Sequence, residues 1–125
     1  MTRVFLSIGA LSAGLAVAAG ALGAHALRGR FDARMMEVFE VAVRYQMYHA
    51  LALAITAWVA GRSPGMLANS AGWLFVSGTL VFSGSLYALS LGGPRWLGAV
   101  TPLGGLAFLG GWLSLALAAW RLDGN

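Results

Sequence analysis

The stretch VFLSIGALSAGLAVAAGALGAHAL, residues 4–27, contains no formally charged residue and lies between Arg3 and Arg28. A helix needs roughly 20 apolar residues to cross the hydrocarbon core of a bilayer, so this stretch is long enough for a span. A cleaved signal peptide is the rival interpretation, because an arginine precedes the run and Ala24-His25-Ala26 near its end resembles a cleavage site. The apolar region of such a peptide is roughly 7–15 residues long, which favours a membrane span here.

The whole chain is similarly apolar, since 59% of its 125 residues are hydrophobic and 10% are charged. A chain of this length has too little interior to bury so much apolar surface, so the sequence predicts one integral membrane domain over residues 1–125. The eight basic residues are arginines scattered near span ends, which argues against a nucleic-acid partner. The absence of cysteine excludes disulfides and thiolate metal sites.

Four apolar runs predict an all-α, four-helix membrane bundle with spans at about 4–27, 42–60, 71–91 and 97–120. Turns rich in glycine and proline separate the second, third and fourth runs, at residues 61–65 and 92–95. The first run has small residues at every fourth position, which predicts close packing against another helix: Ser12, Ala16, Gly20 and Ala24.

An amphipathic interfacial helix is expected over residues 32–44, between the first two spans. Asp32 suits its N-cap, and charged residues recur at helical spacing along one side: Arg34, Glu37, Glu40 and Arg44. No glycine or proline interrupts residues 32–60, so the helix either continues into the second span or bends where the charges end. The uncharged run that follows is short for a membrane crossing, so the second span must include the last turn of this helix. Arg44 would then lie at the headgroup boundary.

The aromatic residues agree with these spans. Tryptophans are predicted at the boundary that both termini share: Trp58, Trp73 and Trp120. Tyrosines and one further tryptophan are predicted at the opposite boundary: Tyr45, Tyr48, Tyr87 and Trp96. More arginines lie on the side of the amphipathic helix, so the positive-inside rule places that side in the cytoplasm and the termini on the other side.

The polar residues of the spans gather in one leaflet, on the side of the amphipathic helix. Counting about 1.5 Å per residue places His49, Tyr87 and Thr101 at similar depths below this boundary. Polar groups at such depths face the bundle interior or a wet cavity. We therefore expect a polar pocket open to one side, with candidate binding residues and no catalytic set: His25, Arg44, Tyr45, Gln46, His49, Ser83, Ser85, Tyr87 and Thr101.

Each candidate also has a plain structural interpretation. His25 and His49 would hold a metal or a haem iron if they were neighbours, although interhelical hydrogen bonding is the commoner role. Arg44 suits an anionic headgroup or an ion pair with Glu40, one turn earlier. The serines of the stretch 83–85 lack an acid and an ordered base, so they favour helix packing over nucleophilic catalysis.

Five short motifs follow one another through all four spans: Gly23-Ala24-His25-Ala26-Leu27, Tyr45-Gln46-Met47-Tyr48-His49-Ala50, Phe82-Ser83-Gly84-Ser85-Leu86-Tyr87, Thr101-Pro102-Leu103-Gly104-Gly105 and Gly111-Trp112. Together they resemble the motifs of the YgdD-like membrane proteins, a family defined by a domain of unknown function. The resemblance implies a four-span protein of the bacterial inner membrane without a cleaved signal. It implies no activity, substrate or cofactor. Arg28 stands where a lysine commonly follows the first motif.

Three function classes are compatible with this sequence. The favoured class is a non-enzymatic accessory, assembly or lipid-contacting protein without a cofactor, whose partners are membrane lipids and a second protein or another copy of the chain. A small oligomeric transporter or channel is the second class, although the uncharged spans hold no carboxylate that would couple transport to protons. A haem or metal protein built on His25 and His49 is the third class.

Overall fold

The computed structural model describes residues 1–122, which form helices and no strand. Five α-helices and two π-helical turns follow one another: α1 (Thr2–Leu22), η1 (Gly23–Leu27), α2 (Ala33–Arg62), α3 (Met66–Gly78), η2 (Thr79–Ser83), α4 (Gly84–Ser90) and α5 (Leu97–Ala119). Because η2 continues α3 into α4, these three elements make one helical stretch of 25 residues, Met66–Ser90. The all-α prediction is confirmed.

Local chemistry sets where the helices begin and where the chain turns. Asp32 caps α2 as predicted, since its carboxylate accepts a hydrogen bond from the Met35 backbone N–H at 2.7 Å. Gly29 and Gly92 have φ angles of 90° and 101°, in the left-handed region that residues with a side chain rarely adopt. These two glycines therefore allow the reversals between α1 and α2 and between α4 and α5.

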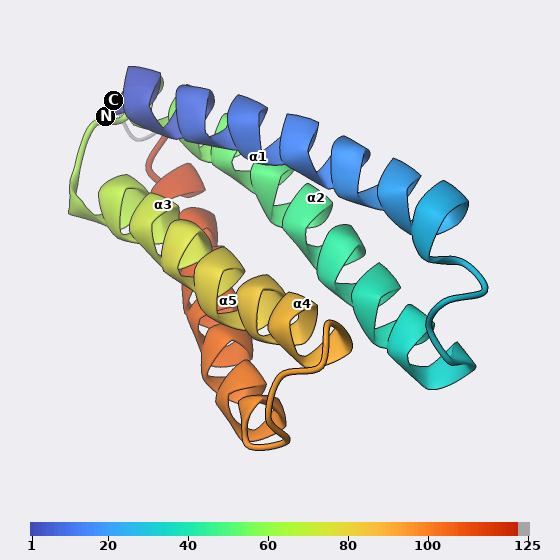
Figure 1. The fold of residues 1–125 in the computed structure, drawn as a ribbon. Helices are drawn as coiled ribbons and strands as arrows, with labels where there is room; N and C mark the ends of the chain where they lie inside the picture. Colours follow the sequence, from blue (N-terminus) through green and yellow to red (C-terminus); the bar gives the residue numbers. More distant parts are fainter. Residues whose placement is uncertain (123–125) are drawn as a thin grey trace.

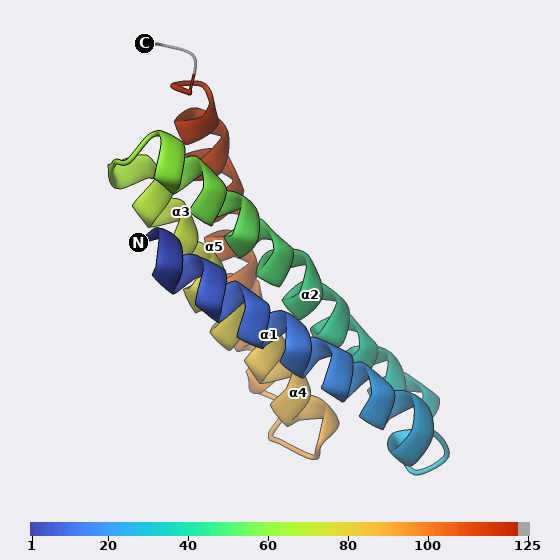
Figure 2. The same ribbon diagram turned by 90° about the horizontal axis from the view of Figure 1, so that it is seen from above.

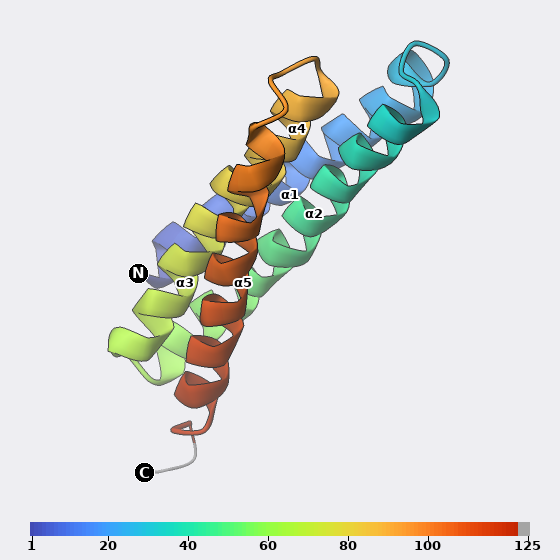
Figure 3. The same cartoon turned by 90° about the horizontal axis from the view of Figure 1, so that it is seen from below.

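Four long helical stretches of residues 1–122, α1 with η1, α2, α3 to α4, and α5, run in alternating directions, so α1 begins at the same end of the molecule at which α5 ends (Figure 1). α1 packs along α2, α2 also packs on α3, η2 and α4, and α5 packs mainly on α3 and η2. Seen from above, α1 lies nearest the viewer, whereas α5 lies nearest in the view from below (Figures 2 and 3). α2 therefore has helical neighbours on more sides than α1 has.

Within residues 1–122, three helical stretches are long and apolar enough to cross a membrane: Thr2–Leu27, Met66–Ser90 and Leu97–Ala119. These correspond to the predicted first, third and fourth spans. The predicted amphipathic helix and second span together form the 30 residues of α2, so the uninterrupted continuation is the one found. α2 is less apolar than the other three, because charged side chains occupy its first half and Gln46 and His49 lie further along.

α1 approaches α3 closely at the end of the molecule where the chain begins. Phe5 is fully buried there, and a Cβ atom added to Gly72 would come within 2.2 Å of its ring. The rings of Phe5 and Trp73 also meet edge to face, with centroids 5.4 Å apart. Away from this contact, α1 diverges from α4, whereas α2 stays packed on η2 and α4 (Figure 1). The divergence opens a space on one side of α2.

Candidate functional site

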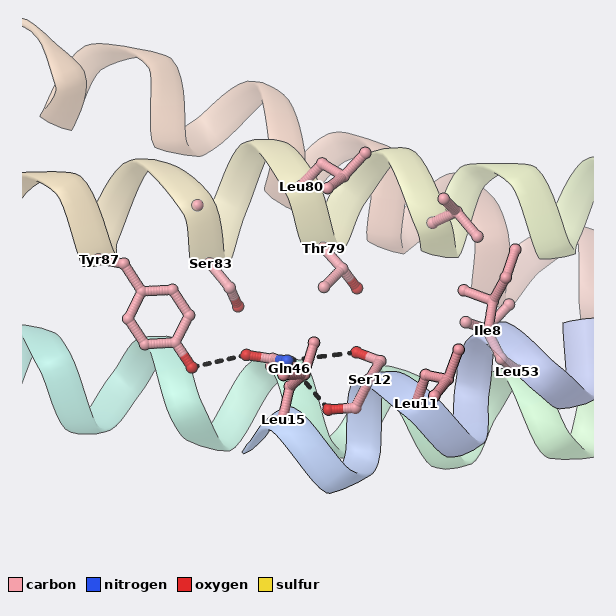
Figure 4. A pocket seen from close by; sticks show the side chains of 12 residues that line it. Ile8, Leu11, Ser12, Leu15, Gln46, Leu53, Thr79, Leu80, Ser83 and Tyr87 are labelled. Carbon is pink, nitrogen blue, oxygen red and sulfur yellow. Dashed lines mark hydrogen bonds between the residues drawn. The ribbon is translucent and has the colours of Figure 1, made fainter. Parts of the chain in front are cut away.

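A groove of about 360 Å³ lies between α1 and the α3–η2–α4 stretch, with α2 at its base. We call it the α1–α4 groove. Most of its lining is apolar and comes from all three sides: Ile8, Leu11, Leu15, Leu53, Val76 and Leu80. Polar side chains also converge on it, and Figure 4 shows Gln46 at the centre of their hydrogen bonds. The groove is large enough for a small ligand or part of a lipid chain.

Gln46 connects three helices through its side-chain amide. The Nε2 atom donates to the backbone carbonyl of Ser12 at 3.0 Å and, at 3.4 Å, to the Ser12 hydroxyl. The Tyr87 hydroxyl donates to Gln46 Oε1 at 2.6 Å. Gln46 is 8% exposed, and its amide oxygen and nitrogen are both paired. Gln46 therefore holds α1 and α4 to α2 at the base of the groove.

The two serines next to Gly84 point to different neighbours. Ser83 is fully buried and donates to the backbone carbonyl of Ala42 in α2 at 2.8 Å. The Ser85 hydroxyl lies 2.6 Å from the Thr101 hydroxyl in α5. Thr101 in turn donates to the Leu97 carbonyl at 3.1 Å. These hydroxyls join helices, which agrees with their packing interpretation.

Thr79, the first residue of η2, is half-buried and differs in its hydrogen bonding from the two buried threonines, Thr56 and Thr101. Thr56 and Thr101 each donate to the carbonyl four residues earlier, the usual bond for a threonine inside a helix. Thr79 Oγ1 is buried and has no hydrogen-bond partner, and it is the one such side-chain oxygen or nitrogen in residues 1–122. In Figure 4 the Thr79 side chain extends toward Ser12 and Gln46 across the groove.

His49 lies on the opposite side of α2 and uses both ring nitrogens. Nδ1 is 2.7 Å from the Tyr45 carbonyl, and Nε2 accepts a hydrogen bond from the Trp112 indole N–H at 3.1 Å. A carbonyl only accepts and an indole N–H only donates, so this geometry places the imidazole proton on Nδ1. The ring also stacks on Phe108, with centroids 3.5 Å apart and planes 4° apart.

Aromatic rings surround this histidine between α2 and α5. We call the group the aromatic cluster: Tyr45, His49, Phe82, Phe108 and Trp112. It lines a second depression of about 710 Å³ on the face away from α1. The Tyr45 and Phe82 rings are tilted by 31° with centroids 4.6 Å apart, and Tyr45 remains 37% exposed. The predicted single pocket is therefore divided by α2 into two sides.

The structure does not bring His25 and His49 together, as the metal or haem alternative would require. His25 is exposed in η1, and Gly23, two residues before it, packs against the Phe39 ring. Phe39 precedes His49 by ten residues of α2, which is about 15 Å of helix. Residues 1–122 contain no group of three or more histidine, cysteine, aspartate or glutamate side chains that could hold a metal ion. Both nitrogens of His49 are already paired, so this structure brings no ligand set together around it.

Arg44 lies outside both sides of the site. Its guanidinium is 4.0 Å from the Glu40 carboxylate, and the two side chains are 56% and 45% exposed. An exposed pair at this distance contributes about 0–1 kcal/mol to stability. Arg44 remains available to polar groups at the membrane surface.

Sequence reasoning missed four residues of the site: Ser12, Thr79, Phe108 and Trp112. Ser12 was assigned to helix packing, and it does lie where α1 packs on α2. Trp112 carried a usable signal, because tryptophan favours membrane boundaries and this one lies inside an apolar run. An indole N–H in such a place needs a buried acceptor, which His49 provides.

Comparison with known proteins identifies relatives over nearly the whole chain. The family described as Protein of unknown function (DUF423) matches residues 19–105. UPF0382 membrane protein SH2409 of Staphylococcus haemolyticus is 45% identical over 98% of this chain and 99% of its own length. UPF0382 membrane protein YwdK of Bacillus subtilis is 45% identical over 94% of this chain and 96% of its own length. No solved structure matches the chain. This chain therefore belongs to the DUF423 family of membrane proteins, whose function is unknown.

Proposed function

We propose that this protein is a four-span protein of the bacterial inner membrane, akin to the YgdD-like proteins, that contacts lipids in an accessory or assembly role. The α1–α4 groove is the observation that carries this proposal. Its walls are mostly apolar, and the hydrogen bonds at its base join helices to one another. Such a groove between diverging membrane helices suits a lipid chain.

In this proposal α2 is the second span. Its 30 residues are about 45 Å long, which exceeds the roughly 30 Å hydrocarbon core. Gln46, His49 and Thr56 are buried by neighbouring helices, so these polar side chains would not be exposed to lipid in a membrane span. The remaining first turns carry exposed Arg34 and Arg44 and would extend to the headgroups, as the amphipathic prediction supposes.

The pairing of the polar groups supports an accessory role over a catalytic one. The Ser83 hydroxyl is committed to the Ala42 carbonyl, and the Ser85 hydroxyl to Thr101. His49 would have to release Trp112 or the Tyr45 carbonyl before it could act as a base. A nucleophile needs a base within hydrogen-bonding reach, and neither serine has His49 as its partner.

The arginine distribution supports an orientation with the termini outside the cytoplasm. Five arginines belong to the end that holds the α1–α2 and α4–α5 connections: Arg28, Arg30, Arg34, Arg44 and Arg95. Three belong to the opposite end: Arg3, Arg62 and Arg121. A C-terminal fusion to a phosphatase that folds only outside the cytoplasm should be active. An inactive phosphatase together with a fluorescent cytoplasmic reporter would reverse the orientation.

Lipid retention tests the proposed function directly. The protein is reconstituted in bilayers of phosphatidylethanolamine and phosphatidylglycerol, extracted in mild detergent and weighed by native mass spectrometry. We expect retained phospholipid, and less of it in Gly84→Leu, because Gly84 lines the groove and has open space beside it. Gly98→Leu is the matched control, since Gly98 also has open space and lies outside the groove lining. Retention of neither lipid nor a protein partner would refute the proposal.

A further inference from the structure

Thr79 lines the α1–α4 groove, and its hydroxyl is buried without a hydrogen-bond partner. A hydroxyl buried among apolar side chains without a partner is costly, because it gives up its hydrogen bonds to water. Thr56 and Thr101 avoid this cost through the carbonyl four residues earlier, whereas Thr79 does not. Its side chain extends into the α1–α4 groove (Figure 4).

A water molecule is a poor partner at this position. A buried water needs two to four polar partners, and nearby the Ser12 hydroxyl is the donor that remains unused within residues 1–122. The Gln46 amide is paired with Ser12 and Tyr87, and the Ser83 hydroxyl is paired with the Ala42 carbonyl. Most of the remaining lining is apolar. An occupant that brings its own apolar surface together with one polar atom fits the groove better.

The depth of Thr79 excludes the ester carbonyls of ordinary phospholipids. Thr79 lies near the middle of the 25-residue stretch Met66–Ser90, and so near the bilayer centre if that stretch spans the membrane. Ester groups lie at the edge of the hydrocarbon core, roughly 15 Å from its centre. An acyl chain reaches Thr79 but offers only methylenes at that depth, which accept no hydrogen bond.

We propose that the α1–α4 groove binds a neutral lipophile whose carbonyl oxygen lies in the bilayer interior and accepts a hydrogen bond from Thr79 Oγ1. The inference rests on the lipid-contacting function proposed above and names the chemistry of the occupant. η2 supports it independently, because π-helical turns within α-helices are frequent at functional sites. Gly84 directly follows this turn and leaves the groove open where a side chain would fill it.

The probe is a straight-chain ketone with an isotope-labelled carbonyl at its middle carbon, added to the protein in nanodiscs. Infrared spectroscopy resolves its carbonyl band, which moves to lower wavenumber when the oxygen accepts a hydrogen bond. In the wild-type protein we expect a shifted band that saturates with added ketone. The alkane of equal length should compete for it about fivefold less well than unlabelled ketone, as the loss of one hydrogen bond implies.

Two variants assign the bond to Thr79. Thr79→Val keeps the shape of the side chain and should abolish the shifted band, whereas Thr79→Ser keeps the hydroxyl and should restore it. Thr56→Val is the matched control, because Thr56 is buried outside the groove and bonded within its own helix. It should leave the band unchanged. A shifted band that persists in Thr79→Val would overturn the inference, as would its absence from the wild type.

The two proposals fail in different ways. Phospholipid retained by the wild type and reduced by Gly84→Leu, without a shifted ketone band, would overturn the carbonyl ligand and keep the lipid-contacting function. Loss of both signals from a wild-type protein that shows its normal thermal transition would overturn both proposals. Equal competition by ketone and alkane would also overturn the inference, since it would show that the groove recognises only hydrocarbon.

Discussion

The two sides of α2 differ in whether the protein itself supplies every hydrogen-bond partner of their buried polar groups. On the side of α5, the aromatic cluster encloses His49, stacks it on Phe108 and pairs both of its nitrogens. On the side of α1, Gln46 is paired in the same complete way, but Thr79 across the groove is not. The protein therefore pairs both nitrogens of His49 on one side of α2, whereas on the other side the Thr79 hydroxyl is left for a ligand to pair.

Glycines show the same contrast in the packing. A Cβ atom at Gly104 of α5 would lie 2.5 Å from the Phe82 backbone nitrogen, so α5 and η2 are in close backbone contact. Gly84, on the groove side, has no atom within 4 Å of such a Cβ. Close approach stabilises membrane helices through van der Waals contact and leaves no room for an occupant. The two glycines therefore show tight packing between α5 and η2 and open space at the edge of the α1–α4 groove.

The largest effect on stability should follow from disrupting the close backbone contact between α5 and η2. Gly104→Ala forces apart two backbones that cannot move like flexible side chains, so we expect a loss of about 2–3 kcal/mol in unfolding free energy. Gly84→Ala should change it by less than about 0.5 kcal/mol. Denaturation in mixed micelles measures both variants. Equal losses would show that the two sides do not differ in packing.

Gln46→Leu should have the next largest effect, because it removes the connection from α2 to both α1 and α4. We expect a loss of about 1–2 kcal/mol, since the Tyr87 hydroxyl is left without its acceptor. The double variant Gln46→Leu with Tyr87→Phe should lose less than the sum of the single variants. Additive losses in the same denaturation experiment would mean that the two side chains are not coupled.

His49→Phe tests the aromatic side with the stacking ring retained. The Trp112 indole N–H then loses its acceptor, which should cost about 1 kcal/mol and shift its proton resonance. Trp112→Phe in the same background should remove most of this cost, because no unpaired donor remains. An unchanged indole resonance in His49→Phe would contradict the hydrogen bond.

Thr79→Val should have the smallest effect on the ligand-free protein. Its hydroxyl has no partner to lose, so the unfolding free energy should change by less than about 0.5 kcal/mol or rise slightly. Thr56→Val, which gives up a hydrogen bond to the Ala52 carbonyl, should cost about 1 kcal/mol. A larger loss for Thr79→Val than for Thr56→Val would reveal a structural partner for Thr79.

Much of the fold follows from patterns that are local in the sequence. The uncharged run 4–27 predicts the ends of the stretch that α1 and η1 form together, Thr2–Leu27. The glycine-rich turn at 92–95 predicts the start of α5. Asp32 predicts the start of α2 through a bond to its own first turn. The π-helical turns have no comparable signal, because a π-helical hydrogen bond depends on how the stretch packs against its neighbours.

The candidate site was predicted less well, since its partners come from distant segments. Gln46, Ser83 and Tyr87 were identified as inward-facing, but the acceptors for Gln46 and Ser83 include the backbone carbonyls of Ser12 and Ala42. Every residue has such a carbonyl, so no pattern of residue types marks it. Estimating membrane depth from the rise per residue also cannot tell which side of a helix a residue faces, and His49 and Gln46 point to opposite sides of α2.

The sequence alone determined that the chain is helical and membrane-embedded, and it predicted where most of its helices end. These properties depend on the hydropathy and spacing of neighbouring residues. Only the tertiary structure decided which polar groups meet, that α2 separates the aromatic cluster from the α1–α4 groove, and that the Thr79 hydroxyl is left unpaired. These properties depend on the rotation of each helix about its axis and on the divergence of α1 from α4, which packing between distant segments sets.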